Sequence, residues 1–499
     1  MNKHLLVHRD LKLENILIKY ENKKLIFKLT DYGLSKQLLT ISKRMTSKIG
    51  TYHFIAPEIL KGESYNQECD LWSLGVIIYV LYFRKYPYNG EDNLAILRQI
   101  ETQGQNALEK SRNYYLDDLI RKLLTADQNK RIKWESYFNH PIFNDKQQPN
   151  IILIKLIIKK SAISNDIYFL GNNKNENHNN ELNESNIEIF INDNKMKFNK
   201  YFRPTKEGEY EIKIVFKNKI KNCSYMFNKC NYIKSIDLSF FDSSDVTNMS
   251  YMFSECFTLE NINLTNLKAD NVIDMSYMFN KCYELRCLQF PESFNTQNLE
   301  KMTSMFHWCQ NVTDIIFPSS FITNKVTSMR TLFGKCYNLK RIILIYFDTK
   351  EVSDMSYMFE QCNSLEEILI NPSLFKTDKV NNMAHMFSEC FSLKEIDLSS
   401  FNIQNVKHTS YMFYNCQNLN IVDFSKSKNN NIANMSHMFD GCSKILLINI
   451  SPFEIIDKEK IEKMFDNISL NVEKIITNRY CIEEYIETFR NIQDKLLFQ

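Results

Sequence analysis

Three side chains near the start of the chain have the types and spacing needed for phosphoryl transfer. Asp10, Lys12 and Asn15 fall within one short run, VHRDLKLEN. Phosphoryl transfer needs an acceptor hydroxyl held in line, a carboxylate that receives its proton, and cations that neutralise the developing charge. A carboxylate, an ammonium and an amide in one loop suit these three roles.

The segments that must position this loop follow at ordered spacing. Asp31-Tyr32-Gly33 comes sixteen residues after Asn15, directly after the strand-like run LIFKL, and GTYHFIAPE follows it. ECDLWSLGVIIYVL predicts a buried helix, and NKRIKW comes later. This order of motifs resembles the catalytic half of the eukaryotic protein kinase domain, with Tyr in place of the usual Phe in the D-F-G motif.

The resemblance assigns roles to the candidate residues. It implies that Asp10 is the catalytic base, that Lys12 contacts the transferring phosphate, and that Thr51 contacts both. Asn15 and Asp31 would hold the Mg²⁺ that bridges the phosphates of ATP. A lysine at position 12 also suggests kinases that act on Ser and Thr hydroxyls of proteins.

The same resemblance marks a second set of structural or regulatory positions: His8, Arg9, Gly33, Ser47, Glu58, Asp70 and Arg131. Asp70 would hydrogen-bond the backbone of the catalytic loop, and Arg131 would pair with Glu58. Ser47 stands at the family's usual phosphorylation position, where Arg9 offers a cation for the phosphate. A solvated serine in a Lys-rich loop is an equally good interpretation.

The resemblance starts at the catalytic loop. A Gly-rich strand pair, a strand lysine and a helix glutamate would precede His8, where only seven residues stand, so no ATP-gripping residue can be named. The chain as written is therefore expected to be impaired or inactive. Three explanations are open: a truncated gene model, a fragment completed by another chain, or a decayed kinase used for binding. Intact motif residues favour the first.

A second pattern recurs from Cys223 onward, as in NMSYMFSECFTLENINL and DMSYMFEQCNSLEEILI. Its phenylalanines lie 26 to 28 residues apart, at Phe227, Phe253, Phe279, Phe306, Phe333, Phe359, Phe387, Phe413 and Phe439. Phe465 marks a degenerate tenth unit. Each unit predicts a helix or turn followed by one strand, and stacked units would form a solenoid with a parallel sheet. The pattern resembles BspA-like leucine-rich repeats, a family associated with protein interaction.

Nine of the thirteen cysteines occur once per repeat: Cys230, Cys256, Cys282, Cys309, Cys336, Cys362, Cys390, Cys416 and Cys442. Zinc sites need several ligands at close spacing, whereas one cysteine per turn makes a column. We therefore expect a buried, reduced structural ladder, with Met and Phe filling the core. Binding specificity would come from variable strand positions such as Arg341, Lys394 and Glu395, but they identify no ligand.

These observations predict a multi-domain protein with four parts. A mainly α kinase C-lobe (1–145) is followed by a linker and small β-rich adaptor (146–220), an α/β leucine-rich-repeat solenoid (221–476) and a C-terminal cap (477–499). A net charge of +3 indicates neither nucleic acid nor an anionic membrane as a partner. The longest apolar stretch is too short to span a membrane, and the N-terminus is not typical of a cleaved signal, so we expect a cytoplasmic protein.

The leading hypothesis is a protein of the Ser/Thr kinase family that uses ATP and Mg²⁺ in its complete form. Its solenoid would bind protein partners or bring protein substrates to the catalytic residues. The alternative is a non-catalytic scaffold that uses both regions for protein interaction. An extracellular adhesin, suggested by the repeats alone, fits the kinase-like region poorly. Substrate, activator, solenoid ligand and oligomeric state are not specified by the sequence.

Overall fold

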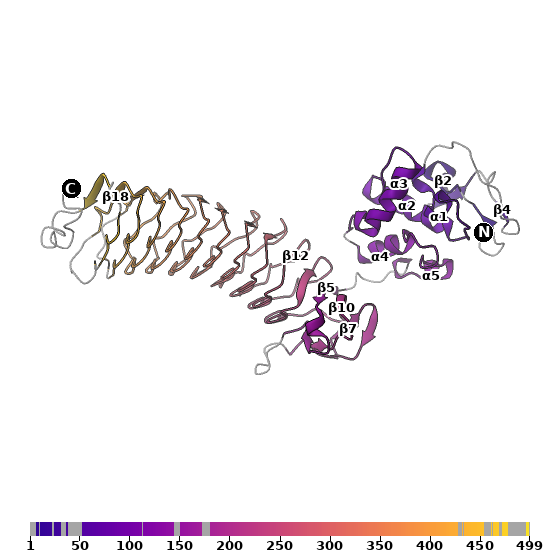
Figure 1. Cartoon of the computed structure of the whole chain (residues 1–499), viewed down its shortest axis with the longest axis horizontal. Helices are drawn as coiled ribbons and strands as arrows, with labels where there is room; N and C mark the ends of the chain where they lie inside the picture. Colours follow the sequence, from indigo (N-terminus) through magenta and orange to yellow (C-terminus); the bar gives the residue numbers. More distant parts are fainter. Residues whose placement is uncertain are drawn as a thin grey trace. The chain divides into compact units, whose positions relative to one another are not determined.

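A computed structural model of the chain describes residues 6–8, 10–21, 24–30, 36–37, 52–111, 113–143, 150–171, 180–427, 432, 434–453, 461, 463–468, 472–477 and 496–498. The chain divides into two compact units, Met1–Pro149 and Asn150–Gln499, which we call unit 1 and unit 2 (Figure 1). The candidate residues Arg9, Asp31, Gly33, Ser47 and Thr51 lie outside the described residues.

Unit 1 is mainly helical in its described part, as predicted. Its helices are α1 (Pro57–Leu60), α2 (Cys69–Phe83), α3 (Asn93–Gln103), α4 (Tyr114–Leu123) and α5 (Trp134–Phe138). Its strands form two antiparallel pairs, β1 (Leu6–Val7) with β4 (Lys36–Gln37), and β2 (Ile16–Glu21) with β3 (Lys24–Leu29).

Helix α2 forms the core of unit 1 because it is apolar on almost every side. Trp72, Val76 and Tyr79 on this helix are almost fully buried. Gly75 permits close packing against α4, since a Cβ atom there would lie 2.8 Å from the Cβ of Leu123. None of the helices in the described residues is both long and apolar enough to cross a membrane.

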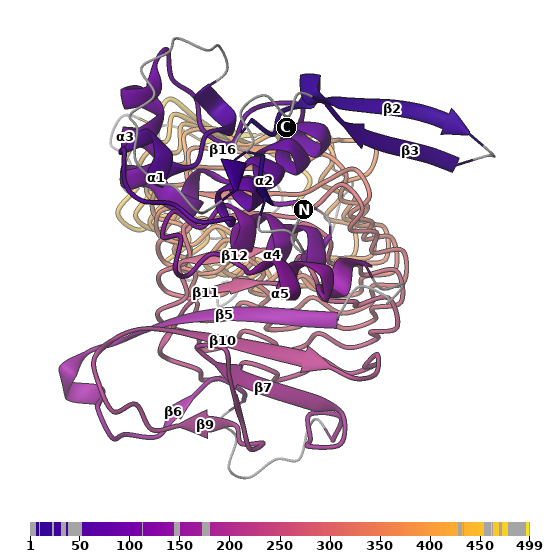
Figure 2. The ribbon, with the colours of Figure 1, turned by 90° about the vertical axis from the view of Figure 1, so that its right-hand side faces the viewer.

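Unit 2 begins with an antiparallel sheet that continues into the repeats. This sheet contains β5 (Asn150–Ile158), β7 (Ile187–Ile191), β8 (Asn194–Met196) and β10 (Gly208–Phe216), and β6 (Ile167–Tyr168) pairs with β9 (Tyr201–Phe202) in a separate sheet. Together with β11 (Ile233–Asp237) and β12 (Asn261–Asn263), the first sheet has six strands in the order β12-β11-β5-β10-β7-β8, and Figure 2 shows β5, β10 and β7 side by side. Strand β11 comes from the first repeat and pairs antiparallel with β5. The β-rich region and the repeats therefore share one sheet.

The repeats form a β-solenoid whose strands pair in parallel, as predicted. These strands are β11 (Ile233–Asp237), β12 (Asn261–Asn263), β13 (Cys287–Gln289), β14 (Asp314–Ile316), β15 (Arg341–Leu344), β16 (Glu367–Ile370), β17 (Ile421–Asp423), β18 (Leu447–Asn449), β19 (Lys474–Thr477) and β20 (Leu496–Phe498). Strands β13 and β14, β15 and β16, and β17 to β20 pair in parallel with the same registry in successive turns. The turns follow one another along the stack in Figure 1.

The helical part of the predicted α/β solenoid is wrong for the described repeats. In the second repeat, Tyr251 and Glu255 have φ angles of 56° and 60°, which an α-helix of L-residues does not tolerate. The backbone N–H of Tyr251 donates to the carbonyl of Ser276 in the next turn at 2.9 Å. The Met and Phe spacing fits both a helix and a tight backbone turn. Hydrogen bonds between successive repeats stabilise the tight backbone turn.

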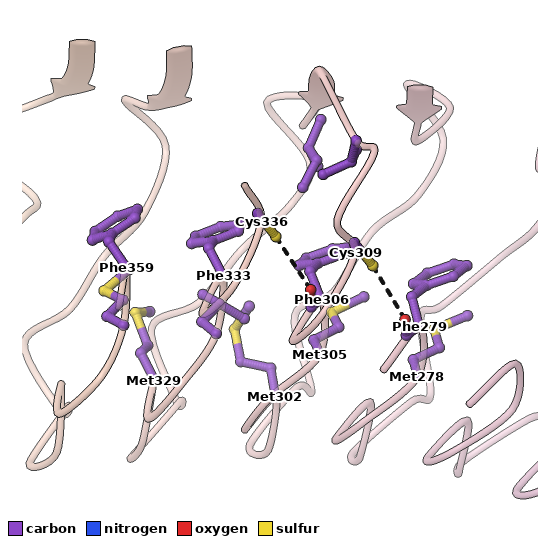
Figure 3. Close-up of a cluster of buried hydrophobic side chains, with 14 of the residues drawn as sticks. Met278, Phe279, Met302, Met305, Phe306, Cys309, Met329, Phe333, Cys336 and Phe359 are labelled. Atoms are coloured by element: carbon purple, nitrogen blue, oxygen red, sulfur yellow. Dashed lines mark hydrogen bonds between the residues drawn. The ribbon is translucent and has the colours of Figure 1, made fainter. Parts of the chain in front are cut away.

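The core of the solenoid is a column of stacked phenylalanines (Figure 3). The ring of Phe306 lies 5.8 Å from that of Phe279 and 5.6 Å from that of Phe333. Beside this column, the thiol of Cys309 donates to the carbonyl of Phe279 at 3.2 Å, and burial raises the pKa of Cys309 to about 12. The repeat cysteines are buried, which confirms their predicted place in the core.

Each of these thiols is small enough for the core, and those from Cys256 onward supply a weak donor to a carbonyl of the preceding turn, whereas Cys230 lies 3.8 Å from the carbonyl of Asn228 in its own turn. The bond recurs from Cys256 to Cys442 with Sγ···O distances of 3.0 to 3.3 Å. A cysteine at this position therefore adds a second donor to a buried carbonyl, such as that of Phe279, which also accepts from the N–H of Cys282 at 3.1 Å, without adding a bulky polar group.

Candidate catalytic site

The structure brings Asp10, Lys12 and Asn15 together around one carboxylate. The short 3₁₀ turn Leu13–Asn15 returns the amide of Asn15 to the start of the loop. Its Nδ2 donates to the carbonyl of Asp10 at 2.8 Å and to Oδ2 of the same residue at 3.0 Å. The ammonium of Lys12 lies 2.9 Å from that Oδ2. The carboxylate is thus oriented by an amide and paired with a cation.

The accessibility of these groups suits a site that meets a substrate. The side chains of Asp10 and Lys12 are 21% and 16% exposed, so both are reachable from solvent while held in place. Asn15 is almost fully buried. A partly exposed carboxylate on a buried amide can receive a proton from a bound hydroxyl.

The catalytic loop is anchored from two sides. The backbone N–H of His8 donates to Oδ2 of Asp70, in the first turn of α2, at 2.8 Å. The ring Nε2 of His8 lies 3.2 Å from the carbonyl oxygen of Thr30, at the end of β3. The N–H of Thr30 donates in turn to the carbonyl of Asn15 at 2.9 Å. The loop position therefore depends on α2 and on the β2–β3 hairpin.

Arg131 and Glu58 form a buried ion pair behind the loop. Two nitrogens of the guanidinium donate to the two carboxylate oxygens at 2.7 and 2.8 Å, a bidentate arrangement. Arg131 also donates to the carbonyl of Glu68 at 3.0 Å and lies 5.2 Å from the ring of Trp72. The pair therefore joins α1 to the start of α2.

Sequence reasoning missed two residues that support the site. Thr30 positions both His8 and Asn15 through its backbone, and Ser73 on α2 donates to the carbonyl of Phe54 at 2.7 Å. Both work mainly through bonds that involve backbone groups 15 to 22 residues away in the sequence. The only signal in the sequence was their position, one residue before Asp31 and three residues after Asp70.

The described part of the site offers one oxygen ligand for Mg²⁺. The Nδ2 of Asn15 donates to Asp10, which leaves its Oδ1 directed elsewhere, and an amide oxygen is a ligand that Mg²⁺ accepts. The other proposed ligand, Asp31, lies outside the described residues. Within the described ranges, no group of three or more His, Cys, Asp or Glu side chains converges as a metal site would require.

Comparison with protein families decides how the chain is classified. Four overlapping segments, 195–317, 300–426, 327–453 and 367–478, match the family described as Mycoplasma protein of unknown function, DUF285, and together they cover more than half of the chain. The chain belongs to the DUF285 family. Residues 1–143 match the protein kinase domain, so this DUF285 protein also carries a kinase region.

Curated relatives match the kinase region. Calcium-dependent protein kinase 4 of Plasmodium berghei (strain Anka) is 41% identical over 145 residues, which are 28% of this chain and 27% of the relative. The protein of the same name from Plasmodium falciparum (isolate 3D7) is 40% identical over 145 residues, with the same coverage. Calcium-dependent protein kinase 3 of Plasmodium yoelii yoelii is 34% identical over 171 residues, 34% of this chain and 30% of the relative. The chain thus spans under a third of the length of these relatives.

Proposed function

We propose that the kinase region transfers the γ-phosphoryl group of ATP to Ser or Thr hydroxyls of protein substrates. The observation that carries this proposal is the carboxylate of Asp10, held by the amide of Asn15 and paired with Lys12 at 2.9 Å. A base, a cation and an oxygen ligand on one short loop are the parts that phosphoryl transfer requires. Identity of 41% to a protein kinase over this region supports it.

Each residue has a distinct role in this proposal. Asp10 receives the proton of the attacking hydroxyl, and Asn15 keeps its carboxylate in one orientation. Lys12 moves from the carboxylate toward the transferring phosphate, and Thr51 contacts both groups. Asn15 and Asp31 hold Mg²⁺, which neutralises charge on the phosphate oxygens when it is bound.

The remaining motif residues support or regulate this chemistry. The contact of His8 with Asp70 holds the loop in place, and the pair of Arg131 with Glu58 holds α1 in place. We extend the proposal to regulation: a phosphate on Ser47 would pair with Arg9, and Gly33 would let the backbone beside Asp31 turn. Calcium dependence is a property named for the relatives and is not part of the proposal.

Phosphate transfer from radiolabelled ATP to a generic Ser/Thr substrate tests the proposal directly. The chain should be expressed together with any in-frame coding sequence upstream of Met1, with and without Mg²⁺. Asp10→Asn should lower the rate about 10²- to 10⁴-fold, because it removes the base and keeps the shape. Glu101→Gln, a substitution at an exposed ion pair far from the loop in sequence, is the matched control and should leave the rate unchanged. Equal rates for Asp10→Asn and the unsubstituted chain would contradict the proposal.

We propose that the DUF285 repeats supply a protein-interaction surface, as the resemblance to BspA-like leucine-rich repeats implies. Their strands present variable outward residues on a rigid, repeated backbone, which suits the recognition of a protein partner. In the scaffold alternative this surface is the whole function. Calorimetric titration with ATP and Mg²⁺ separates the two, because a chain that binds partners but no nucleotide would be a scaffold.

We also propose that the protein works in the cytoplasm. Its ladder of free, buried thiols suits a reducing compartment, and the proposed chemistry needs ATP. A tagged chain should therefore fractionate with cytosolic proteins. Recovery outside the cell would instead favour the adhesin alternative.

A further inference from the structure

One column of positions along the strand side of the solenoid changes its chemistry in the middle of the array. The column lies seven residues after each repeat cysteine and is polar in six units, at Asp237, Asn263, Gln289, Asp397, Asp423 and Asn449. In the three central units it is apolar: Ile316, Ile343 and Leu369 are 47%, 42% and 38% exposed. We call these three residues the apolar stripe. Single exposed apolar residues are ordinary, but three in consecutive turns form a patch.

In the six-stranded sheet at the start of unit 2, ion pairs link neighbouring strands or turns. Lys155 on β5 pairs with Glu211 on β10 at 3.2 Å, and Lys234 pairs with Glu260 in the first two repeats. Such pairs keep a sheet face hydrated and discourage association. The apolar stripe is therefore a local change within its own column of positions.

Charges beside the stripe are sorted by turn. The turn that carries Ile343 has two exposed basic residues, Lys340 and Arg341, and the turn that carries Leu369 has two exposed acidic residues, Glu366 and Glu367. The parallel register sets Arg341 beside Glu367, with Nη1 and Oε2 3.9 Å apart, and Ile343 beside Leu369. The surface charge therefore changes from positive to negative from one turn of the solenoid to the next.

This arrangement complements itself under a two-fold rotation. The axis of this rotation lies between the two facing copies, parallel to the strands and level with the gap between β15 and β16. It reverses the order of the turns in the second copy but keeps each residue at the same height along its strand. β15 of one copy then faces β16 of the other. Ile343 meets Leu369 of the second copy, and Lys340 and Arg341 meet its acidic residues. A surface that matches its own rotated image fits a second copy of the same chain.

We propose that the apolar stripe and its two charged turns are a face-to-face dimer interface between two copies of this chain. The two sheets would pack about 10 Å apart, with their central strands crossing at about 30°. Apolar contact at the centre and four basic–acidic encounters around it supply the attraction. The interface goes beyond the proposed kinase function and does not depend on it.

The flanking turns limit the size of the interface. Under the same rotation, Asp314 faces Glu395 of the second copy, and Ile316 faces Asp397. Two sheets that pack face to face cross at about 30°, which displaces these outer positions sideways but leaves the acidic residues near each other. We therefore expect a weak dimer, and Asp314→Asn should tighten it by about two- to fivefold.

Charge reversal tests the dimer directly. Sedimentation of the full chain from about 1 µM to about 200 µM should show reversible dimers. K340E/R341E and E366K/E367K should each weaken dimerisation at least about tenfold, because like charges then meet at the centre. An equimolar mixture of the two variants should form heterodimers. Lys379→Glu, which reverses a charge at an exposed pair away from the stripe, is the control and should dimerise normally.

Each further outcome has a defined meaning. Circular dichroism should show that both double variants melt like the unsubstituted chain, and the heterodimer itself proves that both are folded. A chain that stays monomeric at the highest concentration overturns the proposal. Dimers that neither double variant weakens, or variants whose mixture fails to associate, also overturn it.

Discussion

The two units satisfy their buried polar groups in opposite ways. In unit 1, Arg131 reaches Glu58 across 73 residues of sequence, and the described residues contain no second buried pair of this kind. In unit 2, the bond from Cys309 to Phe279 recurs with the same geometry from turn to turn. Unit 1 therefore depends for its stability on unique long-range contacts, whereas unit 2 distributes its stability over equivalent contacts between neighbouring turns.

The strongest way to break this comparison is to remove the unique pair. Arg131→Met should destabilise unit 1 by about 3–5 kcal/mol, because it leaves the carboxylate of Glu58 buried without a cation. Hydrogen exchange measured by mass spectrometry resolves the two units separately. Peptides of α2 should lose protection, while peptides of the repeats keep theirs.

Lys130, the residue before Arg131, provides a control for the loss of one positive charge at an exposed position. Lys130 is 79% exposed and pairs with Asp127 at 3.6 Å, so Lys130→Met should change stability by no more than about 0.5 kcal/mol. If Arg131→Met and Lys130→Met behave alike, the view of unit 1 as dependent on unique contacts is wrong.

The contrast also explains what the sequence could predict. Parallel strands and a buried cysteine column follow from a pattern that repeats every 26 to 28 residues, so each unit gives independent evidence of the same contact. In unit 1, the helical content follows from apolar stretches such as α2. The grouping of Asp10, Lys12 and Asn15 is expected because they share one short loop.

Other features depend on contacts that no local pattern encodes. Turns replace helices in the repeats because residues such as Tyr251 bond to the next turn, which local spacing cannot show. The pairing of β5 with β11 joins the β-rich region to the repeats across about 80 residues of sequence. The support that Thr30 gives to the catalytic loop works through its backbone, so its side-chain type carries no signal.

The next test concerns the position of a substitution within the solenoid. Phe306 stacks on both Phe279 and Phe333, so Phe306→Ala should cost about 3–5 kcal/mol. Phe465, in the degenerate last unit, stacks on Phe439 and is more exposed, so Phe465→Ala should cost about half as much. Denaturant unfolding of each variant measures both. Equal costs would show that the terminal unit is held as firmly as the centre.

Alkaline pH should lower the stability of unit 2 through its buried repeat thiols, which is a further difference between the units. Burial raises the pKa of Cys309 from an ordinary 9.0 to about 12, so folding favours the protonated thiol. Its contribution is therefore fully present below about pH 9 and declines as the pH rises toward 12, by about 1.4 kcal/mol per pH unit. In urea titrations at pH 8 and pH 10, a Cys309→Ala variant should lose less stability than the unsubstituted chain, and equal losses would contradict a buried thiol.

Acidic pH should also lower the stability of the solenoid, and this should be the smallest of the predicted stability effects. Burial, with Lys335 and Lys281 nearby, lowers the pKa of His307 from 6.5 to about 4, and burial with Arg330 does the same for His385. Folding favours the neutral rings, so this stability is present above pH 6.5 and is lost as the pH falls toward 4. Because both rings are partly exposed, the loss should be well below about 1.4 kcal/mol per pH unit for each.

The measurement for these histidines is a comparison between variants, because carboxylates also titrate as the pH falls. His307→Gln and His385→Gln should each flatten the decline in unfolding free energy between about pH 6.5 and about pH 5, where few carboxylates have gained protons. Lys335→Met removes one cation near His307 and should raise the pKa of this ring, since a neighbouring positive charge opposes protonation. The loss of unfolding free energy that His307 causes should then end at a higher pH. A decline that is unchanged in all three variants would place the acid sensitivity outside the solenoid and remove this contrast between the units.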